Sequence, residues 1–230
     1  MSNEKALSRR LAAAIPYITE GGRVADIGTD HAYLPIELVR RGILQSALAC
    51  DIGSGPILRA RAHIETAGMT DRIQTLQTDG LHGVESYEPT DIILFGMGGE
   101  LIAKILSAAE WIKTRRVNLI LQPMTKAEIL RRWLNENGLE ILDEELICDE
   151  RYYQILHVRY TGKTEDYTDA ELLVGKKILG GHSPLLKGYL ERQAELLSSA
   201  LEGKRRGGLD CAAEEALLND ILKRIDRIGG

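Results

Sequence analysis

GRVADIGTDHAYLP, residues 22–35, carries the strongest structural signal of this chain. Val24 to Ile27 form a short apolar run typical of a buried strand, Gly28 follows as a turn residue, and a helix is expected to begin near Ala32. Backbone N–H groups at a helix start lack intrahelical partners, and the helix dipole adds positive potential there. The stretch therefore predicts a strand, a glycine turn and a helix that together cradle a polar ligand.

The turn departs from the dinucleotide-binding fingerprint, because Asp30 and the residues from His31 to Tyr33 stand where further glycines are expected. An acid at this place repels a pyrophosphate, whereas it suits the cationic amino and sulfonium groups of S-adenosylmethionine. The loop thus favours a methyl donor over NAD. A purely structural turn is the alternative, since strand–glycine–helix turns are common.

The chain has 230 residues, enough for one α/β core and a smaller appendage. Its 29 basic and 34 acidic residues argue against a histone-like nucleic-acid binder but allow a local basic patch. No apolar run approaches the roughly 18 residues of a membrane span, and the start, MSNEKALSRRL, has no signal-peptide core. We expect a soluble, cytoplasmic protein.

The cysteines and histidines do not form a metal-binding pattern. Three cysteines are widely spaced and without a CxxC pair, and the five histidines do not fall at ligand spacing. We therefore expect reduced cysteines and no structural metal. The residues are Cys50, Cys148 and Cys211, and His31, His63, His82, His157 and His182.

Strand-like and helix-like segments alternate through the first two thirds of the chain. This alternation predicts an α/β fold with a doubly wound, mostly parallel sheet of seven strands. The expected strands are 24–27, 46–52, 73–78, 90–99, 117–122, 139–148 and 152–160, with Pro123 ending the fifth, and the expected helices are 5–18, 32–41, 56–67, 100–109 and 126–137.

Ligand-type residues follow the second and third strands as well as the first. Asp51 ends the second strand 25 residues after Asp26, a spacing that suits an acid bound to ribose hydroxyls. A helix-capping role for Asp51 is the alternative, although Ser54 can already cap that helix. Asp79 follows the third strand and could accept the exocyclic amine of an adenine, or simply form a turn with Gly80.

The fourth strand breaks at Gly96-Met97-Gly98-Gly99, and glycines at such a place let a ligand approach the backbone closely. Because the carboxyl ends of parallel strands meet at one edge of the sheet, all four loops are expected to line one ligand site.

From about residue 161 the character changes, and we place a domain boundary there: 1–160 for the α/β domain and 161–230 for an arm. A short helix is expected over 168–179, then longer ones over 185–201 and 210–228 with apolar residues every 3.5 positions, typical of a coiled-coil hairpin. Such a hairpin permits a monomer or a weak homodimer. Lys204 to Arg206 in the connection either contact phosphate or neutralise the preceding helix end.

Five motifs together resemble the bacterial TrmK family, class I methyltransferases that modify N1 of the adenine at position 22 of tRNA. They are VADIGTDHAYLP, ACDIGSGPILRA, TDGL, ILFGMGGELI and LILQPM, and the resemblance covers essentially the whole chain. It implies a Rossmann-like domain with a C-terminal coiled-coil arm, S-adenosyl-L-methionine as methyl donor and tRNA as substrate.

The resemblance also implies which residues bind the donor. Residues that match the family's motifs are expected to hold the methionine end, the ribose and the adenine, and to form a floor between donor and acceptor. They are, in that order, Asp26, Gly28, Thr29 and Asp30; Asp51 and Ile52; Asp79, Gly80 and Leu81; and Gly96, Met97, Gly98 and Gly99. Many nucleic-acid N-methyltransferases end the fourth strand with Asn or Asp, two prolines and an aromatic, so recognition of the target base here needs other residues.

Four residues are candidates for catalytic roles. Gln122 offers an amide suited to the adenine edge, Tyr33 could stack on the base, and His31 could contact the base or a phosphate. Asp30 could favour the positive charge that develops on the product. The structural alternatives are packing on the first helix for Tyr33, a satisfied loop residue for His31 and a strand-end cap for Gln122.

Scattered basic residues are the expected phosphate contacts, with a solvated surface as the alternative. They are Arg9, Arg10, Lys126, Arg131, Arg132 and Lys204 to Arg206. Other hypotheses for the whole chain are a small-molecule methyltransferase, a non-catalytic nucleotide-binding module and, least favoured, a nicotinamide dehydrogenase.

Overall fold

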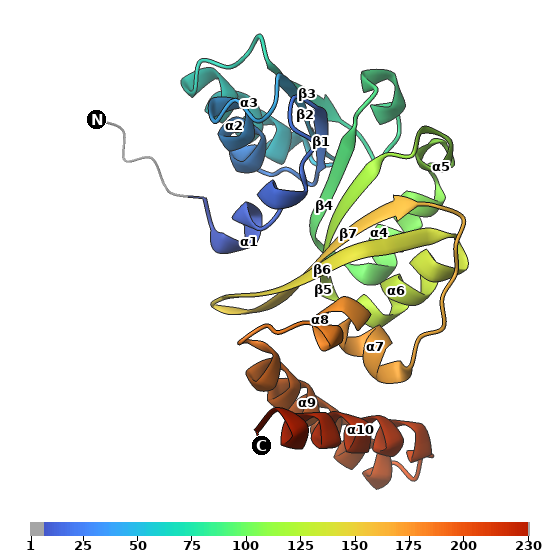
Figure 1. Ribbon diagram of the computed structural model, residues 1–230. Helices are drawn as coiled ribbons and strands as arrows, with labels where there is room; N and C mark the ends of the chain where they lie inside the picture. The colour runs from blue at the N-terminus through green and yellow to red at the C-terminus, as the bar shows by residue number, and fades with distance from the viewer. Residues whose placement is uncertain (1–6, 230) are drawn as a thin grey trace. The chain divides into compact units, whose positions relative to one another are not determined.

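The computed structural model describes residues 7–229 and divides the chain into two compact units, one ending at Glu165 and the other beginning at Asp166 (Figure 1). The division lies close to the boundary expected after residue 160.

The first unit contains one seven-stranded sheet in the order β3-β2-β1-β4-β5-β7-β6. All pairings among the first five strands are parallel, and β7 runs antiparallel to both of its neighbours. The expected mostly parallel sheet is therefore confirmed. The strands are β1 (Arg23–Ile27), β2 (Ser46–Asp51), β3 (Ile73–Gln77), β4 (Asp91–Gly98), β5 (Asn118–Thr125), β6 (Leu139–Asp149) and β7 (Arg151–Tyr160).

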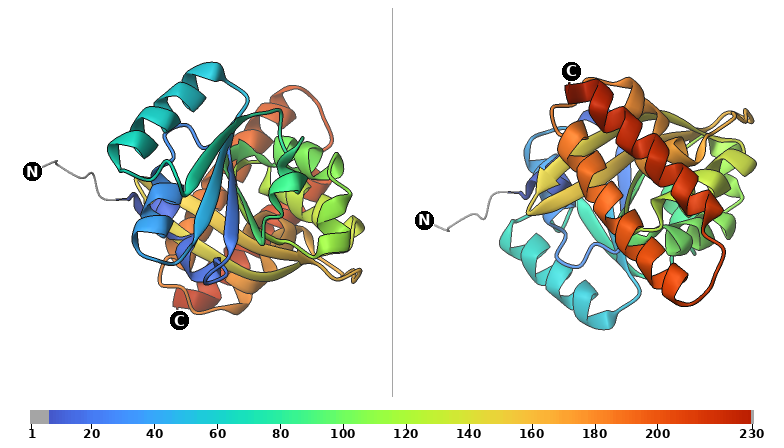
Figure 2. Two further views of the ribbon diagram at one scale, coloured as in Figure 1. Left: turned by 90° about the horizontal axis from the view of Figure 1, so that it is seen from above. Right: turned by 90° about the horizontal axis from the view of Figure 1, so that it is seen from below.

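Helices cover both faces of this sheet (Figure 2). Neighbouring residues of β4 show the arrangement: Ile92 belongs to the core on one face and Ile93 to the core on the other, because side chains alternate along a strand. On the Ile93 side lie α1 (Arg9–Ala12), α2 (Tyr33–Arg40) and α3 (Ser54–Thr66), and on the Ile92 side lie α4 (Gly99–Ser107), α5 (Trp111–Arg115) and α6 (Ala127–Glu136).

The helix expected over 5–18 is wrong in its extent, and Lys5 lies outside the described residues. The structure has α1 and then a 3₁₀ turn, η1 (Ile15–Tyr17). Ser8 caps α1 by accepting from the Leu11 amide, and Pro16 lies in the 3₁₀ turn, where a continuing α-helix would need the N–H that proline lacks.

The predicted end of the fifth strand at Pro123 is also wrong, because β5 continues to Thr125. Its pairing with β4 shifts register between Phe95 and Met97 and again between Met97 and Gly98. An irregular ladder of this kind tolerates a proline. Between β3 and β4 the chain adds a short 3₁₀ helix, η2 (Val84–Tyr87).

The second unit is helical. The helix expected over 168–179 is two helices, α7 (Asp169–Val174) and α8 (Lys176–Gly180), separated by Gly175 at φ 109°. The two long helices, α9 (Leu186–Arg206) and α10 (Ala212–Gly229), lie side by side and antiparallel (Figure 2).

The basic cluster at the end of α9 pairs with acids of the same hairpin. Lys204 contacts Glu214, Arg205 Nη2 lies 2.7 Å from Glu215 Oε1, and Arg206 Nη2 lies 3.6 Å from Glu202 Oε2. Lys204 and Arg205 therefore join α9 to α10 electrostatically, a role that neither interpretation of the sequence included, whereas Arg206 pairs within α9.

A buried polar network joins β4, β5 and β7. The Asp91 side chain is fully buried and accepts hydrogen bonds from the Thr19 amide and from Asn118 Nδ2, at 3.1 and 3.0 Å. Asn118 Oδ1 in turn accepts from Arg159 Nη2 at 2.8 Å and lies 3.0 Å from His157 Nε2. Burial, reinforced by the Arg159 charge, lowers the pKa of His157.

Acid should therefore weaken the fold through His157. Because the pKa of His157 is lower in the folded state, the unfolded chain binds more protons below the ordinary histidine pKa of about 6.5. In that range the free energy of unfolding therefore decreases as the pH decreases. Urea unfolding should show that the free energy of unfolding decreases less between about pH 7.5 and pH 5.5 for His157→Gln than for the parent protein. The control His82→Gln, at an exposed position outside the network, should show the same decrease in the free energy of unfolding as the parent protein. Equal losses in all three proteins would contradict the assignment.

Candidate functional site

The loops after the first three strands are joined by backbone hydrogen bonds at the carboxyl edge of the sheet. The amides of Gly28 and Thr29 donate to the Cys50 carbonyl at 2.8 and 2.9 Å, and the Thr78 amide donates to the Asp51 carbonyl at 2.9 Å. β1 lies between β2 and β4, so the strand order reverses at this point. In open α/β sheets the crevice at such a reversal binds ligands.

The loop after β1 is strained and closed on itself. Asp30 and Ala32 have φ values of 47° and 56°, a left-handed conformation that costs free energy for residues other than glycine. The amides of His31 and Ala32 both donate to the Thr29 carbonyl, at 2.6 and 3.1 Å. The prediction that amides at the helix start are open to a ligand is therefore wrong for His31 and Ala32. The helix itself begins at Tyr33.

Asp26 supplies a buried carboxylate at the end of β1. Its side chain is 7% exposed and accepts a hydrogen bond from Thr29 Oγ1 at 2.7 Å. Burial raises the pKa of Asp26 to about 6, and the Thr29 bond and the Arg10 charge oppose that rise. The carboxylate is therefore ionised at neutral pH, but only narrowly, and a cationic ligand beside it would favour the charged form.

Two of the motif glycines are required for different reasons, Gly28 by its left-handed backbone and Gly99 by close packing. A Cβ on Gly28, at φ 79°, would collide with the terminal methyl of Met97. A Cβ on Gly99 would overlap the backbone of Lys126. The Met97 methyl is the end of a flexible side chain and could move, whereas the backbone contact at Gly99 fixes the start of α4 on the loop after β5.

The loop after β2 presents an acid next to an exposed apolar side chain. Asp51 Oδ1 accepts from the Gly53 amide at 2.8 Å, and its other carboxylate oxygen has no hydrogen-bond partner among the described residues. Ile52 is 66% exposed. The cap position of α3 is Gly53 and makes no side-chain cap, so the expected capping by Ser54 is not observed. The free oxygen suits a ribose hydroxyl, and Ile52 suits the face of a flat ring.

Asp30, His31 and Tyr33 lie together with two residues of α3 that the sequence argument did not select for the site. Asp30 Oδ1 accepts from Arg59 Nη2 at 2.6 Å, so the charge of this half-exposed acid is shared with a guanidinium. The rings of His31, Tyr33 and His63 form a cluster with centroids 5.0 to 5.2 Å apart, and Tyr33 is 42% exposed. Arg59 and His63 are four residues apart, so helical spacing could have identified this pair.

Gln122 and Arg10 form a second unexpected pair. Gln122 is fully buried, and its Oε1 accepts from the Gly96 amide and from Arg10 Nη1, at 3.1 and 3.0 Å. Its Nε2 donates to the Pro123 carbonyl at 3.0 Å. The amide expected to meet a base is therefore engaged inside the protein. Arg10, expected at a phosphate or in solvent, reaches the carboxyl edge beside Asp26.

Among the other expected phosphate contacts, the prediction for Arg131 is wrong. It is fully buried, and it donates from Nε to Glu144 Oε1 at 2.7 Å and from Nη2 to Gln154 Oε1 at 3.0 Å. Arg9, Lys126 and Arg132 are exposed.

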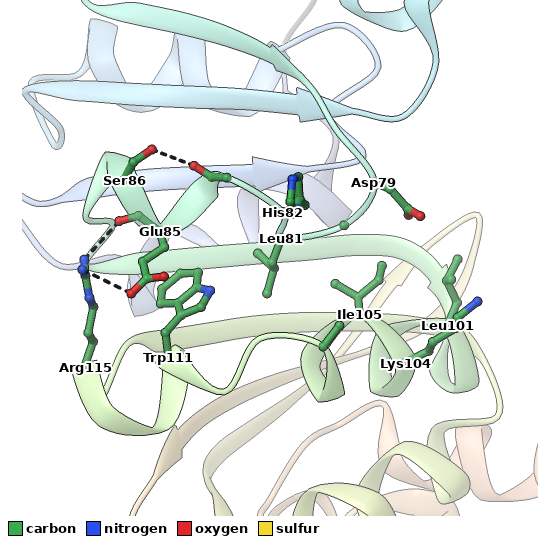
Figure 3. Close-up of a pocket in the computed structure, with 13 residues that line it drawn as sticks. Asp79, Leu81, His82, Glu85, Ser86, Leu101, Lys104, Ile105, Trp111 and Arg115 are labelled. Atoms are coloured by element: carbon green, nitrogen blue, oxygen red, sulfur yellow. Dashed lines mark hydrogen bonds and ion pairs between the residues drawn. The ribbon is translucent and has the colours of Figure 1, made fainter.

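A cavity of about 690 Å³ adjoins the loop after β3 (Figure 3). One wall is the segment from Asp79 to Ser86, and the other comes from α4 and α5. Asp79, Gly80 and Leu81, the residues expected to meet an adenine, all line it. The carboxylate of Asp79 is exposed and has no partner among the described residues.

No helix within residues 7–229 combines the length and apolar character of a membrane span. In the same part of the chain, no group of three or more His, Cys, Asp or Glu side chains is arranged to hold a metal ion.

Comparisons with known proteins place this site in a family. Residues 7–156 match the family model described as a methyltransferase domain. The tRNA (adenine(22)-N(1))-methyltransferase of Bacillus subtilis (strain 168) is 36% identical over 174 residues, which are 75% of this chain and 73% of that protein.

Two solved structures are similar over nearly their whole length. A putative tRNA (m1A22) methyltransferase of Streptococcus pneumoniae, in complex with S-adenosyl-L-methionine, has a TM-score of 0.83 and 31% identity, covering 97% of this chain and 99% of that one. TrmK of M. capricolum, in complex with S-adenosyl-homocysteine, has a TM-score of 0.81 and 28% identity, covering 96% and 99%. With its methyltransferase domain, its acids along one sheet edge and these relatives, the chain belongs to the TrmK family of tRNA (adenine(22)-N(1))-methyltransferases.

Proposed function

We propose that this protein transfers a methyl group from S-adenosylmethionine to N1 of the adenine at position 22 of tRNA. The observation that carries the proposal is the placement of Asp26, Asp51 and Asp79 at the carboxyl ends of three adjacent parallel strands. The names of the relatives supply the target base. A tRNA substrate would place the enzyme in the cytoplasm.

The three acids fit the three parts of the donor. Asp26 accepts the ammonium of the methionine end, the unpartnered oxygen of Asp51 accepts a ribose hydroxyl, and the open carboxylate of Asp79 accepts the adenine amine. Gly28 and Thr29 support Asp26, and Ile52 covers a face of the adenine. Bound S-adenosylmethionine supplies an electrophilic methyl group on its sulfonium sulfur.

The chemistry asks little of the protein beyond positioning. Neutral adenine carries an in-plane lone pair on N1, so no side chain has to remove a proton before attack. The protein therefore aligns N1 with the methyl group and excludes water. Gly96 to Gly99 form the floor of this site, and Gln122 holds the floor by its bond to the Gly96 amide. We assign Gln122 and Arg10 to positioning.

The target base must leave any pair that it makes, because N1 lies on the Watson–Crick edge. The exposed ring of Tyr33, backed by His31 and His63, offers a stacking surface for the base. Asp30 stands next to these rings and favours the cation that forms on the base, with Arg59 moderating its charge. Exposed Arg9, Lys126 and Arg132 are the remaining candidates for phosphate contacts.

Methyl transfer to tRNA tests the proposal directly. Labelled S-adenosylmethionine should methylate an unmodified transcript with adenine at position 22, and incorporation should vanish when guanine replaces that adenine. Donor binding, measured separately by calorimetry, is the control that the protein is folded and binds S-adenosylmethionine. If neither transcript accepts methyl while the donor still binds, the tRNA assignment fails and a small-molecule substrate becomes the better hypothesis.

Donor affinity should fall as the pH drops through about 6, because Asp26 becomes protonated there and loses the charge that pairs with an ammonium. Calorimetric titration with S-adenosyl-homocysteine should show a loss approaching about tenfold per pH unit below that value. Asp26→Asn should bind more weakly at pH 7 and show a flatter profile. An unchanged slope in Asp26→Asn would exclude Asp26 as the titrating group.

Arg10 and Gln122 should act as one unit. Gln122→Ala releases the Gly96 loop, and we expect kcat to fall by about 100-fold, the size of effect that a misplacement of about 1 Å produces. Arg10→Ala should lower kcat in the same direction, and the double variant should lose less than the product of the single effects. Exposed Arg9→Ala is the matched control for kcat and should leave kcat unchanged, with any effect confined to the KM for tRNA, because Arg9 is a candidate phosphate contact. Independent effects together with a raised KM for tRNA in Gln122→Ala alone would instead indicate direct contact between Gln122 and the base.

A further inference from the structure

The cavity beside Asp79 is larger than the adenine that the proposed function places at its entrance. Its volume of about 690 Å³ falls in the range of pockets that hold whole drug-sized ligands. A purine ring would occupy only a part of it, so most of the cavity has no role in the proposed reaction.

The cavity leads away from the donor site along α4. Leu101, Ile105 and Ala108 follow one another at helical spacing on the wall opposite Asp79, and Trp111 continues that wall in α5. Seven residues of helix separate Leu101 from Ala108, which corresponds to about 10 Å. Figure 3 shows Asp79 and Leu101 at one end and Trp111 with Arg115 at the other.

The middle of the cavity is apolar, and a charged pair lies at its far end. Leu81 and Ile105, 5% and 9% exposed, form the middle of the cavity, and Gly80 packs directly on Ile105, which holds the two walls together. At the far end Arg115 Nη1 donates to the Glu85 carbonyl at 3.0 Å, and its guanidinium lies 6.0 Å from the centre of the Trp111 ring. Arg115 Nη2 also lies 3.4 Å from Glu85 Oε1, so its charge is paired, and the Trp111 ring offers a surface for an apolar group.

We infer that this cavity binds adenosine-type ligands whose exocyclic N6 carries an apolar substituent, such as a benzyl group. The inference rests on the proposed function, because it requires the adenine amine to face Asp79. An N6-substituted adenine keeps one N–H, which still donates to the Asp79 carboxylate. Its substituent replaces the other hydrogen and extends over the outer surface of Leu81 and Ile105 toward Trp111.

Binding of product analogues separates this inference from methyl transfer. The ligands are S-adenosyl-homocysteine and its N6-benzyl derivative, titrated by calorimetry and by tryptophan fluorescence. We expect the benzyl derivative to bind at least as tightly as the parent ligand, since its ring leaves water for an apolar pocket. It should also change the emission of Trp111, and this change should disappear in Trp111→Phe, which retains Trp133 as an internal reference.

Filling the cavity should discriminate between the two ligands. Ala108→Phe, at the exposed position directly after α4, should weaken binding of the benzyl derivative by about tenfold or more and leave binding of S-adenosyl-homocysteine unchanged. Ser86→Phe, on the opposite wall, should do the same and guards against a folding defect in a single variant. Ser107→Phe, an exposed neighbour that does not line the cavity, is the matched control and should affect neither ligand.

The outcomes are distinct. If S-adenosyl-homocysteine binds and the benzyl derivative does not, this inference is overturned and the proposed function stands. If both cavity-filling variants weaken the binding of the two ligands equally, the cavity holds the adenine itself and the inference is again overturned. If neither ligand binds to the parent protein, the donor assignment of the proposed function fails.

Discussion

The candidate site depends on one small set of hydrogen bonds, those from the Gly28 and Thr29 amides to the Cys50 carbonyl. They fix the loop after β1 on the end of β2, and from there Thr29 can turn its hydroxyl toward Asp26. The same anchoring allows the left-handed residues that follow to persist, since strain of this kind requires surrounding contacts to hold it. Strand pairing positions Asp26 itself, and these bonds position the loop that carries Thr29 and the ring cluster.

Burial of Asp26 illustrates how the site balances stability against ligand binding. A carboxylate removed from water disfavours its own charge, and a single hydroxyl bond recovers only part of that loss, so the pKa rises to about 6. A group in this state gains more from a cationic partner than a solvated carboxylate would. The local cost in the free protein is therefore a source of affinity for an ammonium.

The sequence predicted the features that depend on neighbours along the chain. Strand periodicity and glycine positions predicted the seven strands and located Asp26, Asp51 and Asp79, because each acid lies within two residues of the carboxyl end of its strand. Features that depend on distant partners escaped it. Arg10 and Gln122 are 112 positions apart, and Arg131 meets Glu144 only because α6 packs on the sheet. The amides of His31 and Ala32 were misjudged for another reason, since they turn back onto the Thr29 carbonyl of their own loop.

The pairing of charges at the end of the helical hairpin has a consequence for encounters in solution. Three basic residues, Lys204, Arg205 and Arg206, face three acids, Glu214, Glu215 and Glu202. The field of such a balanced cluster decays quickly, and salt at physiological concentration screens what remains beyond about 8 Å. A polyanion diffusing toward the hairpin would meet no long-range attraction there, and acceleration of its approach has to come from basic side chains that have no acid beside them.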